Sequence, residues 1–260
     1  MTVYFDIIRF SFLRFFSYPF EILASVLKRV FEIVFLIIFW TIYIKSSGAN
    51  ISITQISAYF LIALGVADLT MARWGALSST LGNQIKSGQI SNYIIKPTRL
   101  IPTIYAISLG RNGLRLLLAI INIALGLYLL PPKTPLTFLI FILFFINAWA
   151  ISLAYNILEG TLFLHFTDAS GIRNSLQNFI RILTGTMVPL YMFPSPLKEI
   201  IRFSPFPSMV YLPANALSGT PALNSIATDL GVGILWGIVL NFLAFSFWNY
   251  SMKKYEAVGI

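Results

Sequence analysis

The chain has 260 residues, of which 57% are hydrophobic and only 10% are charged, and its formal net charge is +9 at pH 7. A soluble domain carries about 25% charged residues, so this chain has too few to cover the surface of a soluble fold. It has no cysteine and one histidine. These counts exclude disulfides, cysteine nucleophiles and multi-histidine metal sites. The composition favours an all-α integral membrane protein that forms a single transmembrane domain over residues 1–260.

Residues 1–18 predict an amphipathic helix that lies in the membrane interface. At 100° per residue, its polar side chains fall in one arc of about 140°. They are Thr2, Asp6, Arg9, Arg14 and Ser17. The rest of the helix surface is largely apolar, which is typical of an interfacial helix. Pro19 is expected to end it.

Six apolar segments follow and predict six transmembrane helices. A span of the hydrocarbon core needs about 20 residues. The predicted spans are residues 22–44 (or 30–44), 56–77, 104–130, 136–158, 179–192 (with a start as early as residue 172) and 223–248. Polar connections separate them, and the connection over residues 78–99 is rich in Asn, Gln, Ser and Lys.

The stretch over residues 189–221 contains seven of the 13 prolines, so a long helix cannot cross it. The apolar pieces between the prolines are too short to span a membrane. We therefore expect a re-entrant or interfacial helical hairpin before the last span, on the external side. Its candidate residues are Pro189, Pro194, Pro205, Pro207 and Pro213.

The distribution of basic residues predicts the orientation. With the N-terminus inside, 14 of the 18 Lys and Arg residues lie at the inner side of the membrane, which places both termini in the cytoplasm. Orientation and contacts with anionic membrane lipids account for the positive net charge, and no nucleic-acid partner is implied.

The second and third predicted spans contain four charged residues, namely Asp68, Arg73, Arg111 and Arg115. Asp68 is expected to pair with Arg73 in its own span, or with Arg111 or Arg115 in the next, as a structural ion pair. Glu32 and Glu159 are expected at the cytoplasmic boundary, in contact with water. The lone His165 precedes a polar turn, which suits an interfacial side chain better than a catalytic base. Glycine is never followed by lysine, so the chain has no phosphate-binding loop of the Walker A type.

The run Ile85-Lys86-Ser87-Gly88-Gln89-Ile90-Ser91-Asn92-Tyr93-Ile94-Ile95-Lys96-Pro97 after the second span resembles the membrane subunit of type 2 ABC exporters, in a bacterial branch with separate permease subunits. The order of the other elements is similar along nearly the whole chain. So are two parts of the hairpin, Phe203–Pro207 and Tyr211–Gly219, and the chain end, Lys253–Gly259.

The resemblance implies a permease subunit with no catalytic residue, metal site or cofactor of its own. ATP and magnesium would bind to a separate dimer of ATP-binding cassette ATPases in the cytoplasm. A second permease half, identical or homologous, would complete the transporter in the bacterial inner (plasma) membrane. Residues 1–18 would be the connecting helix, and residues 78–99 the coupling segment. The coupling residues implied by position are Leu81, Asn83, Gln84, Ile85, Lys86, Gly88, Gln89, Ile90, Tyr93 and Ile94.

The substrate path implied by the resemblance lies between the two halves, along the second and fifth spans. Candidate residues are Phe60, Ala63, Thr184, Thr186 and Met187. Their mostly apolar character favours a hydrophobic or amphiphilic substrate that is exported by alternating access. Two alternatives stay open, a secondary transporter that works without ATP and a membrane scaffold protein.

Overall fold

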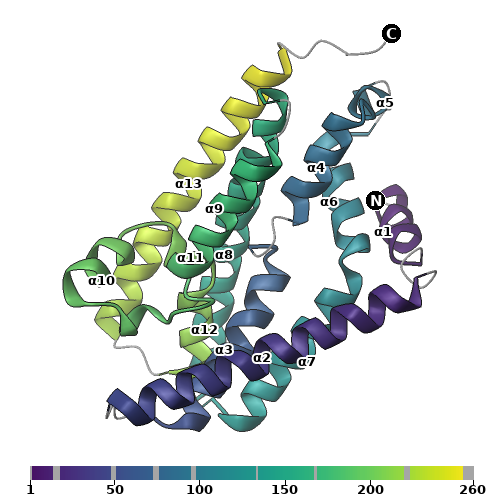
Figure 1. Cartoon of the computed structure of the whole chain (residues 1–260). Coiled ribbons are helices and arrows are strands. Elements are labelled where there is room, and N and C mark those ends of the chain that lie inside the picture. The colour runs from purple at the N-terminus through teal and green to yellow at the C-terminus, as the bar shows by residue number, and fades with distance from the viewer. Residues whose placement is uncertain are drawn as a thin grey trace.

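The computed structural model describes residues 2–13, 18–47, 51–72, 76–94, 98–132, 134–166, 169–219 and 223–253, and every regular element in them is a helix. Figure 1 shows long helices packed side by side, with short helices gathered beside the last one. The elements are α1 (Thr2–Leu13), α2 (Pro19–Ser47), α3 (Ile53–Leu69), α4 (Ala76–Lys86), α5 (Ile90–Ile94), α6 (Leu100–Arg111), α7 (Gly113–Leu129), α8 (Pro135–Thr161), η2 (Leu162–Leu164), α9 (Ser170–Leu183), η3 (Leu190–Met192), α10 (Ser195–Arg202), α11 (Phe206–Met209), α12 (Tyr211–Ser218) and α13 (Leu223–Lys253).

Among the described residues, two helices are long and apolar enough to cross a membrane, Pro135–Leu164 and Ser225–Lys253. A third span results if α6 and α7, which meet at a bend of 66°, are taken together. Helix α2 has 29 residues, but its first half carries Glu21, Lys28, Arg29 and Glu32. The full set of six spans stays a prediction.

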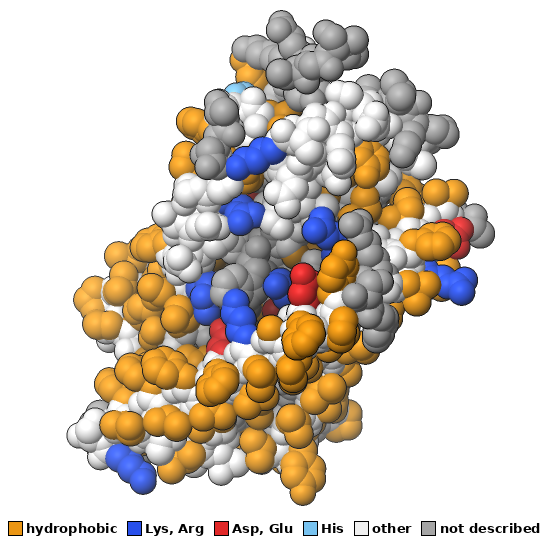
Figure 2. All heavy atoms as spheres, turned by 45° about the vertical axis from the view of Figure 1, so that its right-hand side comes forward, with side chains coloured by type: hydrophobic (Ala, Val, Ile, Leu, Met, Phe, Trp, Pro, Cys, Tyr) orange, Lys and Arg blue, Asp and Glu red, His pale blue; other side chains and the backbone are white. Residues whose placement is uncertain are grey.

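Large apolar side chains cover much of the surface, as lipid-facing helices require. Helix α2 exposes Phe31 and Phe35, α7 exposes Ile120, and α13 exposes Ile238 and Phe242. Figure 2 shows a broad hydrophobic band across the lower part of one face. Basic side chains and a few acidic ones gather above this band, in a hollow in the middle of the face.

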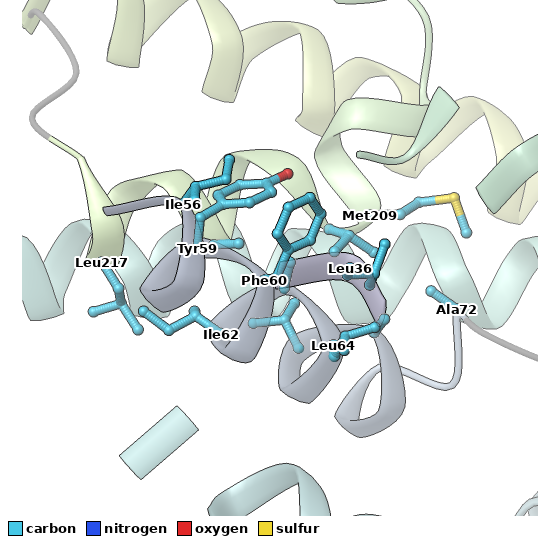
Figure 3. Packing of buried hydrophobic residues seen from close by; sticks show 14 of the residues in the cluster. Leu36, Ile56, Tyr59, Phe60, Ile62, Leu64, Ala72, Met209 and Leu217 are labelled. Carbon is cyan, nitrogen blue, oxygen red and sulfur yellow. The ribbon is translucent and has the colours of Figure 1, made fainter. Parts of the chain in front are cut away.

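Helix α3 is the centre of the core. All of its residues from Ile56 to Asp68 are buried. Figure 3 shows its side chains pointing in several directions, toward Leu36 of α2 and toward Met209 and Leu217 of the short helices. The α3–α7 contact is close, because a Cβ atom at Gly65 would lie 2.5 Å from Ile123 Cγ1 and 2.7 Å from the Ala119 carbonyl oxygen.

The prediction of one helix over residues 56–77 is wrong at its end. Helix α3 stops at Leu69, and the chain turns through Thr70 before α4 starts at Ala76. The Thr70 hydroxyl donates to the Val66 carbonyl at 2.9 Å, and Met71 adopts a φ of +55°. A φ in the left-handed region cannot continue a right-handed helix.

The span predicted over residues 104–130 is not one continuous helix, since α6 and α7 meet at Asn112 with a bend of 66°. The Asn112 side-chain amide donates to the Ser108 carbonyl at 2.7 Å. The Asn112 side chain thus forms a local hydrogen bond with the backbone at the point where the helix is interrupted. Helix α1 packs against α6 at this point. A Cβ atom at Gly110 would lie 2.5 Å from the Ile8 carbonyl oxygen. Arg14 and Ser17 of the predicted interfacial helix lie outside the described residues.

The fifth helix was predicted over residues 179–192, with a start as early as residue 172. It covers Ser170–Leu183, which is 14 residues long, so it agrees with the early start but ends before the predicted end. It ends because Gly185 has a φ of +87°, a conformation that glycine adopts readily. An α-helix of this length extends about 21 Å, which is less than the thickness of roughly 30 Å of a hydrocarbon core. The segment after it forms η3 and the short helices α10, α11 and α12.

Candidate functional site

The predicted coupling segment folds as two helices, α4 and α5, joined by a tight turn over residues 87–89. The Gly88 amide donates to the Ile85 carbonyl at 3.0 Å, and Gly88 has a φ of +68°. The Ser87 hydroxyl donates to the Asn83 carbonyl at 2.8 Å. A residue with a Cβ atom would be strained at this φ, so Gly88 fixes the sharpness of the turn.

Helices α4 and α5 have an inner apolar side and an outer polar side. Leu81 and Ile90 are fully buried, and Ile85 packs at the edge of the same cluster. Asn83, Lys86 and Gln89 are exposed, whereas Gln84, Gly88 and Tyr93 are half-buried. The side chain of Ile94, and residues Ile95, Lys96 and Pro97, lie outside what the structure describes. In Figure 1, α5 lies at the same end of the molecule as the C-terminal end of α13.

Helix α4 is fixed to the chain segment that follows α8. A Cβ atom at Gly82 would lie 2.6 Å from the ring of Phe163, so helix and ring are in tight contact. Lys86 Nζ lies 5.3 Å from the centre of the same ring, which is a cation–π distance. It also donates to the hydroxyl of Ser170, the first residue of α9, at 2.8 Å.

Glu159 is not in contact with water, which corrects the sequence-based expectation. Glu159 is only 1% exposed, because α4 and α9 cover this end of α8. The carboxylate accepts hydrogen bonds from the Ser78 hydroxyl at 3.0 Å, the Tyr155 hydroxyl at 2.5 Å and the Gln177 amide at 2.5 Å. The backbone amide of Ser78 donates to Asn156 Oδ1 at 3.3 Å. Glu159 thus joins three helices through one buried carboxylate.

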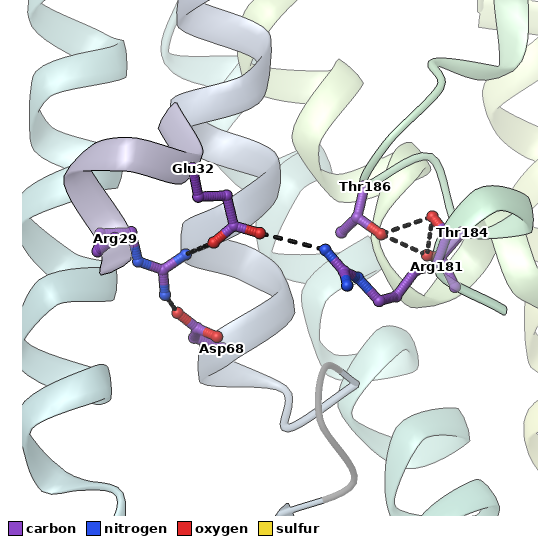
Figure 4. A network of polar contacts seen from close by, with 6 residues as sticks. All are labelled: Arg29, Glu32, Asp68, Arg181, Thr184 and Thr186. Atoms are coloured by element: carbon purple, nitrogen blue, oxygen red, sulfur yellow. Dashed lines mark hydrogen bonds and ion pairs between the residues drawn. The ribbon is translucent and has the colours of Figure 1, made fainter. Parts of the chain in front are cut away.

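Asp68 pairs with Arg29 of α2, a partner that the sequence analysis did not name (Figure 4). Both side chains are nearly inaccessible, at 2% for Asp68 and 8% for Arg29. Arg111 and Arg115 are exposed, and Arg115 donates to Asn112 Oδ1 at 3.1 Å. Arg73 lies outside the described residues.

The network of Figure 4 continues from Arg29 to α9. Arg29 Nη1 lies 3.6 Å from Glu32 Oε2, and Arg181 Nη2 of α9 lies 3.2 Å from Glu32 Oε1. Helices α2, α3 and α9 are therefore linked by two basic and two acidic side chains. The i, i+3 spacing of Arg29 and Glu32 was visible in the sequence, but the contacts with Asp68 and Arg181 depend on packing between distant helices.

The predicted path residues do not line one open surface in this conformation. Phe60 and Ala63 are fully buried in the α3 core. Thr184 and Thr186 are buried and lie 3.0 Å apart between their hydroxyl oxygens, and Thr186 also donates to the Arg181 carbonyl at 2.7 Å. Met187 is exposed, and its carbonyl accepts a hydrogen bond from Trp40 Nε1 at 3.1 Å. Their role in a substrate path stays a prediction.

The prolines of the predicted hairpin mark the starts of its short helices. Pro189, Pro194 and Pro205 directly precede η3, α10 and α11, and Pro207 and Pro213 lie in the first turns of α11 and α12. Beside these helices is a cavity of about 190 Å³ whose lining includes Lys198, Tyr211 and Asn215. In its wall, Arg202 Nε donates to Asp229 Oδ1 of α13 at 2.7 Å.

A family model described as ABC-2 family transporter protein matches residues 30–259 of the sequence. The match covers every helix from the middle of α2 to the end of α13. No curated protein matches the chain.

Proposed function

Since the chain belongs to the ABC-2 family of transporter proteins and is a multi-pass membrane protein, we propose that it is the permease half of an ATP-driven exporter in the bacterial inner membrane. ATP and magnesium bind to a separate ATPase dimer, and this chain carries no cofactor. A second permease half, identical or homologous, completes the path. The substrate is hydrophobic or amphiphilic and crosses by alternating access.

The α4–α5 pair is the observation that carries this proposal. A segment that passes movement from a motor to a membrane domain needs a firm attachment and a free face. Gly82 and Lys86 attach it to Phe163 and Ser170. The exposed side chains of Asn83 and Gln89 supply the free face. We assign this face as the docking surface for the ATPase, which makes this end of the molecule the cytoplasmic one.

Co-purification tests the proposal. The full chain is expressed with the ATP-binding proteins of its own cell and purified in mild detergent. Wild type is compared with Gln89→Trp, which adds bulk to the proposed docking face at an exposed turn position. Gly88→Trp would also strain the turn, so it is the less specific variant. Thr134→Trp, exposed at the other end of α8, is the matched control.

We expect an ATPase to be recovered with wild type and Thr134→Trp but lost with Gln89→Trp. Recovery of an ATPase with all three would move the docking surface away from α4–α5. If no ATPase is recovered with any of them, the ATP-driven proposal is wrong, and the secondary-transporter or scaffold function takes its place.

A further inference from the structure

Helix α9 has several polar side chains on its inner side and a stripe of large apolar side chains on its outer side. Gln177 is buried, and Arg173 and Arg181 are half-buried. Its exposed large apolar residues are Ile172, Leu176, Phe179 and Ile182. A surface helix of a soluble protein has the opposite arrangement. The attachment of α9 to the rest of the chain therefore depends strongly on polar contacts.

Three polar contacts attach α9 at three levels, each to a different helix. Ser170 at its start accepts from Lys86 of α4 at 2.8 Å. Gln177 in its middle donates to Glu159 of α8 at 2.5 Å. Arg181 in its last turn pairs with Glu32 of α2 at 3.2 Å. The start of α9 is thus tied to the proposed coupling segment, and its end is tied to α2.

The Glu32–Arg181 pair differs from the neighbouring Arg29–Asp68 pair in its access to water. Both Glu32 and Arg181 side chains are 16% exposed, whereas that of Asp68 is 2% exposed. A partly hydrated ion pair opens at lower cost than a fully buried one, because water can solvate the separated charges. Asp68 keeps its contact with Arg29 when Arg181 leaves Glu32, so opening this one pair does not strand a buried carboxylate.

The chain after Arg181 is suited to allow such an opening. Helix α9 ends at Leu183, and Gly185 has a φ of +87°. Trp40 Nε1 of α2 donates a hydrogen bond to the Met187 carbonyl at 3.1 Å. The segment beyond the glycine is therefore tied to α2 independently of Glu32. A change in backbone angle near Gly185 would let α9 move while this segment stays in place, once the hydrogen bond from the Thr186 hydroxyl to the Arg181 carbonyl, at 2.7 Å, is broken.

We propose that Glu32 and Arg181 form a releasable latch that holds the end of α9 against α2 in the resting state. They are positioning residues that set which conformation of the transport path is populated. This role rests on the proposed transport function, in which movement of the coupling segment reaches α9 through the Lys86–Ser170 contact and releases the latch.

Thiol labelling tests the latch, because the natural chain has no cysteine. Ile180 is 3% exposed on the inner side of α9, so Ile180→Cys reports whether that side becomes accessible. The full chain is reacted with a maleimide in detergent without nucleotide. We expect labelling about fivefold to tenfold faster in Glu32→Gln and in Arg181→Gln. The double variant should be no faster than Glu32→Gln alone, because Glu32→Gln already removes the contact with Arg181. Arg181→Lys, which keeps the charge, should label nearly as slowly as the parent.

Two controls separate a latch from a general contribution to stability. Arg202→Gln breaks a different ion pair and should leave labelling at position 180 unchanged. Ala148→Cys places the thiol at a fully buried site of α8, where Glu32→Gln should have no effect. Faster labelling at both positions, unchanged labelling at position 180, or additive effects of the two single variants would overturn the latch. None of these results depends on recovering an ATPase, so the latch and the proposed function fail or stand separately.

Discussion

The Ser78 hydroxyl of α4 donates to the Glu159 carboxylate of α8 at 3.0 Å, inside the protein and at the start of the proposed coupling segment. Gln177 of α9 donates to the same carboxylate oxygen, and Tyr155 donates to the other. Three donors around one buried acceptor make its removal costly, because each donor would have to find another partner or stay unsatisfied. Helices α4, α8 and α9 are held in register by this group.

Substitution Glu159→Ala should lower the free energy of unfolding by about 2–4 kcal/mol, since it leaves buried donors without an acceptor. Thermal unfolding of the detergent-solubilised chain measures the effect. Glu159→Gln should be milder, because the amide oxygen still accepts. Glu199→Ala, at an exposed position of α10, is the control and should be close to neutral. Equal unfolding temperatures for Glu159→Ala and the control would contradict the structural role of this carboxylate.

Asp68→Asn should be destabilising, by about 3 kcal/mol, because a buried guanidinium loses its most buried counter-charge and keeps only the longer contact with Glu32, at 3.6 Å. That guanidinium belongs to Arg29 of α2. The paired replacement Arg29→Met with Asp68→Leu removes both charges and should cost much less. Thermal unfolding of both variants and wild type in the same detergent decides between these outcomes. If the paired replacement is as damaging as Asp68→Asn alone, the buried charges have a purpose beyond neutralising each other.

The sequence predicted α8 and α13 well because each is a long and largely hydrophobic run. The fourth span was predicted over residues 136–158, and α8 covers Pro135–Thr161. The end of α3 was missed because Thr70, Met71 and Ala72 carry no turn signal. The α6–α7 bend did have one, the Asn112-Gly113 pair. Such a pair marks turns in many chains but was outweighed here by the apolar residues around it.

The site was harder to predict than the helices, since its contacts join segments far apart in the sequence. Glu159 lies at the end of a predicted span, where water is the default environment. It is buried only because α4 and α9 cover it. Their contacts with Glu159 come from Ser78, which is 81 residues before it, and Gln177, which is 18 residues after it. Periodicity within one helix carries no information about such coverage. The Asp68–Arg29 pair was missed for the same reason, as its basic partner comes from the preceding helix.

Gly65→Ala should force α3 and α7 apart, because the added Cβ atom would lie 2.7 Å from the Ala119 backbone oxygen. We expect a destabilisation of about 1–3 kcal/mol, as for other overpacked helix contacts. A smaller side chain at Ile123 relieves only the contact with that side chain, so Gly65→Ala with Ile123→Ala should not recover wild-type stability.

Gly171→Ala is the matched control for this substitution, since it lies in α9 with no atom within 4 Å of the added Cβ. Alanine favours a helix by up to about 1 kcal/mol relative to glycine. The thermal unfolding temperature should therefore fall for Gly65→Ala and stay unchanged or rise for Gly171→Ala. If neither substitution changes the unfolding temperature, α3 and α7 lie further apart in the membrane than their packing around Gly65 implies.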